Sequence, residues 1–275
     1  MTTHTSSLFD LLRIKQLDYD LFCSAGAAST FGWLYGGQVA AQALLAAGQT
    51  VAPDRVPHSL HGNFLRSGDD ACPTYLRVAR DRDGRSFSAR RVEATQKGEV
   101  LFTMAVSFHR REEGMDRQMD PAPAAGDPDE LEPVRLPLLV SMDCRLPAQP
   151  YAPGFMPTRY WARCTADLAA VADPTDPADP LLHAAVLTYL SDMSTGLIAL
   201  HEGPWRQSPT LSHSLWLHRP IRLDDWVLVD LVPRSVAGGR GWYTGTVHTR
   251  DGRLGASLAQ ESLFGRIRRE PTTEV

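Results

Sequence analysis

Between Leu21 and Pro53 the chain carries no Lys, Arg, Asp or Glu, which severely limits how this region can fold. Within it, Phe31–Gly48 reads as one helix, because small apolar residues recur at helical spacing. Examples are Ala40, Ala43 and Ala47. A helix with so little charge has no face suited to water, so other parts of the chain must surround it closely. We therefore predict a buried central helix.

Four segments after this helix alternate as β-strands. They are residues 58–66, 77–80, 86–92 and 100–108. The turn signals Arg82-Asp-Gly-Arg85 and Gln96-Lys-Gly-Glu99 lie between the later strands and predict a meander of hairpins. An antiparallel sheet that wraps the helix is the simplest arrangement. We assign it to an N-terminal module, residues 8–112.

The composition changes after this module, because prolines recur as far as Pro157 and hydrophobic periodicity disappears. We predict a Pro-rich linker, residues 113–157, that is wrapped over the surface. The order then starts again with a strand at 158–164 and a second charge-poor helix at Pro180–His201. Four further strands are predicted at residues 211–219, 226–232, 241–249 and 254–264.

A helix followed by a meander thus occurs twice, which indicates an internal duplication. The predicted strand Gly241–Val247 matches Ser86–Val92 in its place within the module. We therefore predict an α+β fold of two tandem modules, residues 8–112 and 158–268. In each of them an antiparallel sheet wraps a central helix.

The bulk properties exclude several classes of function. The net charge of −4 and the pI of about 6.1 give no electrostatic basis for binding nucleic acid. The four cysteines are widely scattered and no His cluster has metal spacing, so we expect no metal and no cofactor. The first residues lack a secretion signal, and Gly, Ser, Thr and Gln interrupt the charge-free run too often for a membrane span. We expect a soluble, cytoplasmic protein.

The two modules share a pattern of apolar core positions, so a position at which only one module carries a polar residue is informative. When Gly98 is aligned with Gly252, Val106 falls on Gln260. A carboxamide in a place that its twin fills with valine must find hydrogen-bond partners or cost about 1–3 kcal/mol. The pattern alone leaves two interpretations open, a buried amide with partners or an exposed strand end.

Asp192 is a second break, because the segment 184–199 contains no other charge. Thr188, Ser191 and Thr195 share its face at helical spacing. A face in contact with solvent would normally carry Lys, Glu or Arg. Hydroxyls around a single carboxylate therefore favour an internal polar site over an exposed helix face.

Motifs in both halves carry a family resemblance. In the first half they are Phe31-Gly-Trp-Leu-Tyr-Gly-Gly-Gln38, His58-Ser-Leu-His-Gly-Asn-Phe-Leu-Arg66 and Arg82-Asp-Gly-Arg-Ser-Phe-Ser-Ala-Arg-Arg-Val92. In the second half they are Ser191-Asp192, His213-Ser-Leu-Trp-Leu-His-Arg-Pro220 and Ala256-Ser-Leu-Ala-Gln-Glu261. In this order and spacing, from about Leu8 to Arg266, the chain resembles the acyl-CoA thioesterase II family. Its members are double hot-dog enzymes that cleave acyl-CoA to fatty acid and coenzyme A.

The resemblance implies a catalytic trio of Asp192, Thr210 and Gln260. Two of these already stand out as breaks in the duplicated pattern. Thr210 lies at the start of a predicted strand, where hydroxyls are more often turn or cap residues, so that segment alone indicates little. The sequence departs from the family at Ser212, where Asp is usual, and in the run Met193-Ser-Thr-Gly196, which is more apolar in the family.

These residue types suit thioester hydrolysis. The leaving group is a thiol with a pKa of about 8.5, as in free cysteine, so it needs little help from a general acid. We expect Asp192 and Gln260 to hold the attacking water, with Asp192 taking its proton and Thr210 fixing the geometry. An Asp in an apolar helix would have a raised pKa, which makes it a better base near neutral pH.

The substrate-binding candidates are Gly36 and Gly37, whose N–H groups begin the first helix, together with Arg85, Ser86 and Arg90. The glycines would meet the oxyanion, and the cationic residues would meet the phosphates of coenzyme A. Alternate residues of a strand face opposite ways, so Arg90 and Arg91 cannot both contact one ligand.

Three other classes of protein compete with this interpretation. A hot-dog hydratase would carry an Asp and His pair in one motif on its central helix, and neither helix contains that motif. An α/β-hydrolase would carry G-x-S-x-G, and Gly84-Arg-Ser-Phe-Ser88 lacks the last glycine. A catalytically weak or inactive acyl-CoA-binding protein stays open, because the Ser212 segment is altered. The resemblance also implies outer sheet faces that could pair into homodimers or larger assemblies.

Overall fold

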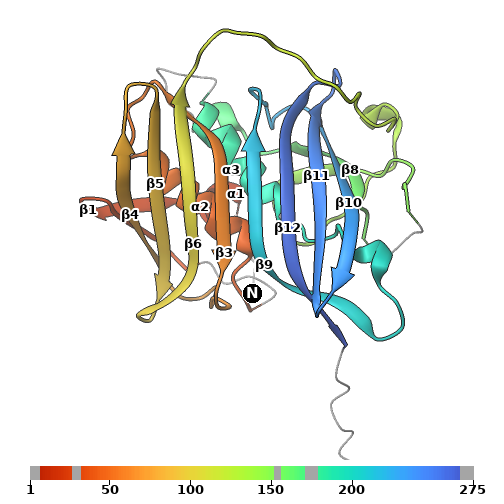
Figure 1. The fold of residues 1–275 in the computed structure, drawn as a ribbon, viewed down its shortest axis with the longest axis horizontal. Coiled ribbons are helices and arrows are strands. Elements are labelled where there is room, and N and C mark those ends of the chain that lie inside the picture. Colours follow the sequence, from red (N-terminus) through yellow and green to blue (C-terminus); the bar gives the residue numbers. More distant parts are fainter. Residues whose placement is uncertain (1–6, 27–31, 152–155, 171–178, 267–275) are drawn as a thin grey trace, which may run out of the picture.

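The computed structural model describes residues 7–26, 32–151, 156–170 and 179–266. Their strands form a single antiparallel sheet, with the two long helices together on one of its sides (Figure 1). In the first half the elements are α1 (Leu8–Leu12), β1 (Ile14–Asp18), β2 (Leu21–Ser24), α2 (Gly36–Gly48), β3 (Arg55–Phe64), β4 (Thr74–Asp83), β5 (Phe87–Gln96) and β6 (Glu99–Arg110). In the second half they are η1 (Pro128–Glu130), β7 (Met142–Arg145), β8 (Arg159–Cys164), η2 (Leu168–Ala170), α3 (Pro180–Ser191), η3 (Ile198–Leu200), β9 (Trp205–Leu217), β10 (Val227–Ala237), β11 (Arg240–Thr249) and β12 (Leu254–Arg266).

The strand order of the second half mirrors that of the first. The sheet runs β1-β2-β4-β5-β6-β3 and continues as β9-β12-β11-β10-β8-β7. The two halves join where β3 pairs with β9, with Leu60 opposite Leu215. The predicted α+β architecture of two tandem modules, each with a sheet around a central helix, is confirmed. The division into residues 8–112, 113–157 and 158–268 stays a prediction.

The central helix α2 begins at Gly36, later than the predicted start at Phe31, which lies outside the described residues. Tyr35 is its N-cap and has an extended backbone, so the helix cannot extend further back. As predicted, α2 is buried along nearly its whole length, and it packs against α3. A Cβ on Gly48 would lie only 2.3 Å from the Leu181 side chain, so the end of α2 needs glycine. No helix among the described residues is both long and apolar enough to cross a membrane.

Helix α3 is shorter than predicted. Asp179 caps its first turn by accepting from the Leu182 N–H at 2.9 Å, and Pro180 follows at the position where proline is best tolerated. The predicted helix to His201 is wrong, because Asp192 is the C-cap and Ser194 has a left-handed backbone with φ of 55°. The polar residues around Asp192 are therefore gathered by a helix end and the turn after it.

Strand β9 begins at Trp205, earlier than predicted, so Thr210 and His213 lie within the strand and not at its entrance. The pairing between β9 and β12 shifts register on both sides of Ser262. Pro209 lies in this irregular part, where a residue without an N–H donor is tolerated. These shifts conceal the strand in the sequence, because periodic alternation is lost there.

The segment predicted as a surface linker also contributes to the core. Leu136 and Leu139 are buried, and β7 within it pairs with β8 as β1 pairs with β2. The Tyr189 hydroxyl of α3 donates to the Leu138 carbonyl at 2.6 Å and accepts from the Val140 N–H at 3.0 Å. This clamp fastens the segment to the second helix.

Replacing Tyr189 with Phe removes both hydrogen bonds and leaves two backbone groups unpaired. We expect Tyr189→Phe to lower the free energy of unfolding by about 1–3 kcal/mol. Urea denaturation measures this change. Tyr75→Phe is the control, because Tyr75 is exposed and its substitution should leave stability unchanged. Equal stability of Tyr189→Phe and the wild type would contradict the role of the clamp.

Candidate active site

Asp192 lies where the end of α3 meets the start of α2. It is 4% exposed, and its carboxylate accepts a hydrogen bond from the Gly37 N–H of the first half. A Cβ on Gly36 would lie 2.5 Å from the Asp192 Oδ2 atom, so only glycine allows this approach. The internal polar site predicted from the charge-free segment is present in the structure, since Thr188, Ser191 and Thr195 are also buried.

Burial raises the pKa of Asp192 to about 7, because a carboxylate shut off from water loses hydration. Hydrogen bonds from Thr210, Ser194 and the Gly37 N–H oppose this shift by stabilising the charged form. The Thr210 hydroxyl donates to Asp192 Oδ1 at 3.2 Å. Asp192 is thus poised to exchange a proton near neutral pH.

Gln260 is 1% exposed on β12, which settles the two interpretations of this position in favour of a buried amide with partners. Its Nε2 donates to Thr210 Oγ1 at 2.7 Å and to Ser194 Oγ at 2.6 Å. Its Oε1 lies 2.7 Å from His213 Nδ1. The three residues of the trio are therefore brought together in one hydrogen-bonded cluster.

Ser194 is a member of this cluster that the sequence reasoning missed. Its Oγ lies 2.9 Å from Thr210 Oγ1 and 3.5 Å from Asp192 Oδ1. The strained left-handed backbone at Ser194 turns the chain back, and such strain is common at functional sites. The only signal in the sequence is a hydroxyl two residues after the conspicuous Asp, which a helical interpretation places on another face.

A cavity of about 660 Å³ opens beside Asp192, Ser194 and Thr210. Its walls are mainly apolar and come from both halves and from the intervening segment. They include Leu34, Val39, Phe64, Leu101, Phe102, Leu138 and Leu211. Gly36 also lines the cavity, as expected for a substrate-binding residue. Arg66 is the one cation among the described lining residues.

The structure does not bring the other predicted substrate-binding residues to this cavity. Arg90 is 1% exposed, and its guanidinium is occupied by Asp83 and by Thr50. Burial and these partners leave it no donor for a phosphate.

Arg85 and Ser86 lie away from the cavity for a different reason. The Arg85 carbonyl accepts from Arg55 at the first residue of β3, whereas Phe64 at the last residue of β3 lines the cavity. That length of strand is about 30 Å at roughly 3.3 Å per residue. The extended backbone of β3 keeps its two ends this far apart, and the motif that contains Arg85 and Ser86 does not encode that separation.

Ser212 lies next to His213 on β9, and neighbouring strand residues face opposite sides of the sheet. Because His213 points inward to Gln260, Ser212 faces away from the cluster. The unusual Ser212 therefore leaves the polar cluster intact. The unusual segment 193–196, in contrast, supplies Ser194 to the cluster.

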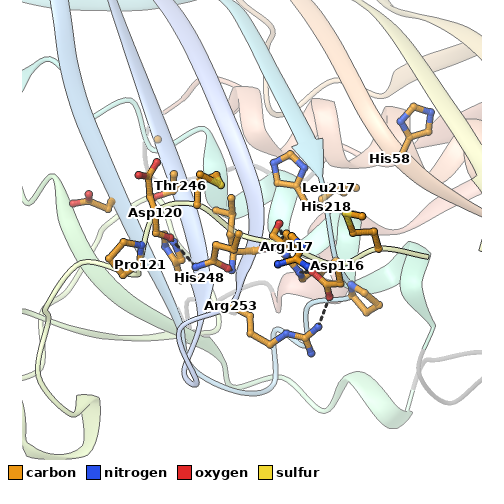
Figure 2. A pocket seen from close by; sticks show the side chains of 18 of the residues that line it. His58, Asp116, Arg117, Asp120, Pro121, Leu217, His218, Thr246, His248 and Arg253 are labelled. Atoms are coloured by element: carbon orange, nitrogen blue, oxygen red, sulfur yellow. Dashed lines mark hydrogen bonds and ion pairs between the residues drawn. The ribbon is translucent and has the colours of Figure 1, made fainter. Parts of the chain in front are cut away.

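A larger cavity of about 1290 Å³ lies elsewhere, between the segment 112–123 and strands β10 and β11. Figure 2 shows Asp116 of this segment paired with Arg253. Its lining contains none of the trio, so cavity size does not identify the active site. Among the described residues, no group of three or more His, Cys, Asp or Glu side chains could hold a metal ion.

Comparison with known proteins agrees with this architecture. The family model "Acyl-CoA thioesterase N-terminal domain" matches residues 25–109, and "Acyl-CoA thioesterase C-terminal domain" matches residues 116–264. Acyl-CoA thioesterase 2 of Haemophilus influenzae is 31% identical over 96% of this chain and 99% of its own length. Human acyl-coenzyme A thioesterase 8 is 29% identical over 92% of this chain and 87% of its own length.

Solved structures give the same result. The acyl-CoA thioesterase II TesB2 from Mycobacterium marinum is 33% identical, with a TM-score of 0.76 over 97% of this chain and 98% of its own. The fold and the polar cluster around Asp192 are those of a double hot-dog thioesterase. With both family models and these relatives covering its length, the chain belongs to the acyl-CoA thioesterase II family.

The raised pKa of Asp192 has a consequence for stability. Folding favours the protonated carboxyl of Asp192. Its contribution to the free energy of unfolding is therefore fully present below pH 3.8, the ordinary pKa of Asp, and is lost as the pH rises through about 7. A shift of this size corresponds to about 4 kcal/mol. We expect Asp192→Asn to be more stable than the wild type at pH 8, and the difference to shrink as the pH falls toward 4. Denaturation of both proteins across this pH range measures it, and a constant difference would contradict the raised pKa.

Proposed function

We propose that the protein hydrolyses acyl-CoA with a water molecule that Asp192 activates. The reaction class follows from the family, so the chain is a thioester hydrolase that releases fatty acid and coenzyme A. The observation that supports the role of Asp192 is its buried carboxyl at the side of an apolar cavity. A base with a pKa near 7 can take a proton from water at neutral pH.

The apolar walls of the cavity suit the acyl chain. Val39 and Phe102 are almost fully buried, and the tilted rings of Phe64 and Phe102 have their centroids 4.7 Å apart. An acyl chain in contact with these side chains brings the thioester carbonyl next to Asp192 and Thr210, which line the same cavity. Burial of the chain thus supplies binding energy that holds the reacting atoms in place.

The water would be held by Asp192 and the two neighbouring hydroxyls. The Gln260 amide donates to Thr210 and Ser194. We therefore give Gln260 the task of orienting these hydroxyls, in place of the direct contact with water expected from the sequence. Thr210, which donates to Asp192, fixes the direction of the carboxylate.

The oxyanion that forms on the thioester carbonyl needs a hydrogen-bond donor. A helix leaves its first N–H groups without partners inside the helix, and Gly36 at the start of α2 lines the cavity. The Gly37 N–H is already used by Asp192. We therefore propose the Gly36 N–H, at the first position of α2, as the oxyanion donor.

Thiol release from acyl-CoAs of graded chain length tests the function. We expect turnover by the wild type, and kcat/KM rising with pH up to about 7 and then levelling, because only ionised Asp192 accepts a proton. Asp192→Asn should lower kcat by about 10²–10⁴-fold while acyl-CoA still binds. Asp230→Asn is a matched control, since Asp230 is a buried carboxylate on β10 outside the cavity.

Two outcomes would contradict parts of this proposal. Full activity of Asp192→Asn would remove Asp192 as the base and leave the family assignment untouched. Tight binding without thiol release from any acyl-CoA would instead support the alternative of an acyl-CoA-binding protein without activity.

Arg66 is our candidate for the phosphates of coenzyme A. Its side chain is 53% exposed, it pairs with the exposed Glu99 at 3.1 Å, and it lines the cavity. We expect Arg66→Ala to raise KM for acyl-CoA by about threefold to tenfold, with kcat nearly unchanged. For acyl-pantetheine, which lacks the nucleotide phosphates, KM should stay the same. Arg85→Ala is the control at the far end of β3, and an equal effect of both variants would contradict the assignment.

We also propose a cytoplasmic location and self-association. All four cysteines lie among the described residues and are free thiols, which suits a reducing compartment. The outer face of the continuous sheet offers a surface on which two copies could pair, and the mass of the protein in solution tests this.

A further inference from the structure

His213 is a buried side chain that the proposed chemistry does not use. It lies on β9, is 1% exposed, and hydrogen-bonds through both ring nitrogens. Nδ1 lies 2.7 Å from Gln260 Oε1, and Nε2 lies 2.8 Å from Ser191 Oγ. His213 therefore connects the end of α3 to the amide on β12.

The partners define which nitrogen carries the proton. Gln260 donates both hydrogens of its Nε2 to hydroxyl oxygens, so its Oε1 faces His213 and must accept. The imidazole then carries its proton on Nδ1. Nε2 of the neutral ring accepts from the Ser191 hydroxyl at 2.8 Å, and the single hydrogen of that hydroxyl turns to it from the Thr188 carbonyl at 3.0 Å. Burial lowers the pKa of His213 to about 4, so the ring is neutral at physiological pH.

We propose that His213 is a positioning residue, which holds the Gln260 carboxamide in the one orientation that directs its N–H groups at the hydroxyls beside Asp192. The proposal deepens and rests on the proposed function. A carboxamide has nearly the same shape when its O and N are exchanged, so packing alone does not select the orientation. A donor fixed on Nδ1 does select it.

The orientation matters for the base. If the amide turned over, its oxygen would face Thr210 and Ser194, and these hydroxyls would donate to it. Thr210 would then no longer donate to Asp192 Oδ1, and the charged form of Asp192 would lose a partner. Its pKa would rise, and a smaller fraction would be ionised at neutral pH.

The first test is independent of activity. In ¹⁵N NMR of the histidine side chains, we expect His213 to show a protonated Nδ1 and an unprotonated Nε2 between pH 5.5 and 8. His213→Asn assigns the signal by removing it. A proton on Nε2 would overturn the proposal, even for a protein that proves to have no thioesterase activity.

The second test compares two substitutions at His213. Leu keeps a similar volume without a donor, whereas the Asn side-chain N–H can still donate to Gln260. We expect His213→Leu to lower kcat by roughly tenfold to hundredfold, with KM changed less than threefold and the apparent pKa of kcat/KM moved upward. His213→Asn should restore most of the activity. His218→Leu is the control, because His218 is an exposed histidine just after β9.

Coupling to Gln260 separates positioning from a general loss of packing. If His213 acts through Gln260, adding His213→Leu to Gln260→Ala costs little further activity. Additive losses, or full activity of a folded His213→Leu protein, would overturn the proposal and leave acyl-CoA hydrolysis by the wild type in place. Absence of thiol release by the wild type would contradict the proposed function. The ¹⁵N NMR measurement of the His213 tautomer would still show whether His213 donates to Gln260.

Discussion

The structure depends on one buried carboxylate at the junction of its two halves. Asp192 ends α3 of the second half, and its charge is met by the first turn of α2, which belongs to the first half. A buried charge needs several donors: Thr210 and Ser194 of the second half supply hydrogen bonds, and the Gly37 N–H of the first half adds another. The close approach of α2 requires Gly36 and Gly37, whose Cβ atoms would collide with Asp192 and Tyr189. The charge-free, glycine-rich helix start is thus a requirement of the site as much as of the core.

The two halves share a topology but differ at the ends of their helices. At the C-cap of α3 lies Asp192, and at the C-cap of α2 lies Gln49. Next to Gln49, the Arg90 guanidinium donates to the hydroxyl and to the carbonyl of Thr50. Duplication therefore produced two similar scaffolds, of which one carries the polar cluster. The other supplies the helix start and much of the apolar wall of the cavity.

The polar cluster is a chain of hydrogen bonds that runs from Ser191 through His213, Gln260 and Thr210 to Asp192, which follows Ser191 in the sequence. A fully satisfied network of this kind is rigid, because loss of any one bond leaves a buried polar group unpaired. Its cost is the raised pKa of Asp192, which lowers stability at neutral pH and makes the carboxylate a useful base. Function and stability therefore oppose each other at this residue.

The sequence by itself determined the duplicated α+β architecture, the buried central helix, and Asp192 and Gln260 as unusual polar residues, because hydrophobic periodicity and breaks in it are local properties. It misjudged α3 and β9, where a left-handed turn at Ser194 and register shifts around Ser262 interrupt the periodicity. It also placed Arg85, Ser86 and Arg90 with the substrate. Arg85 and Ser86 lie at the end of β3 that is far from the cavity, and Arg90 is buried with its donors bonded to other groups. Only the tertiary structure decided which residues meet, and it showed Ser194 and His213 in the cluster, since strand pairing and helix ends bring together groups that no spacing in the chain relates.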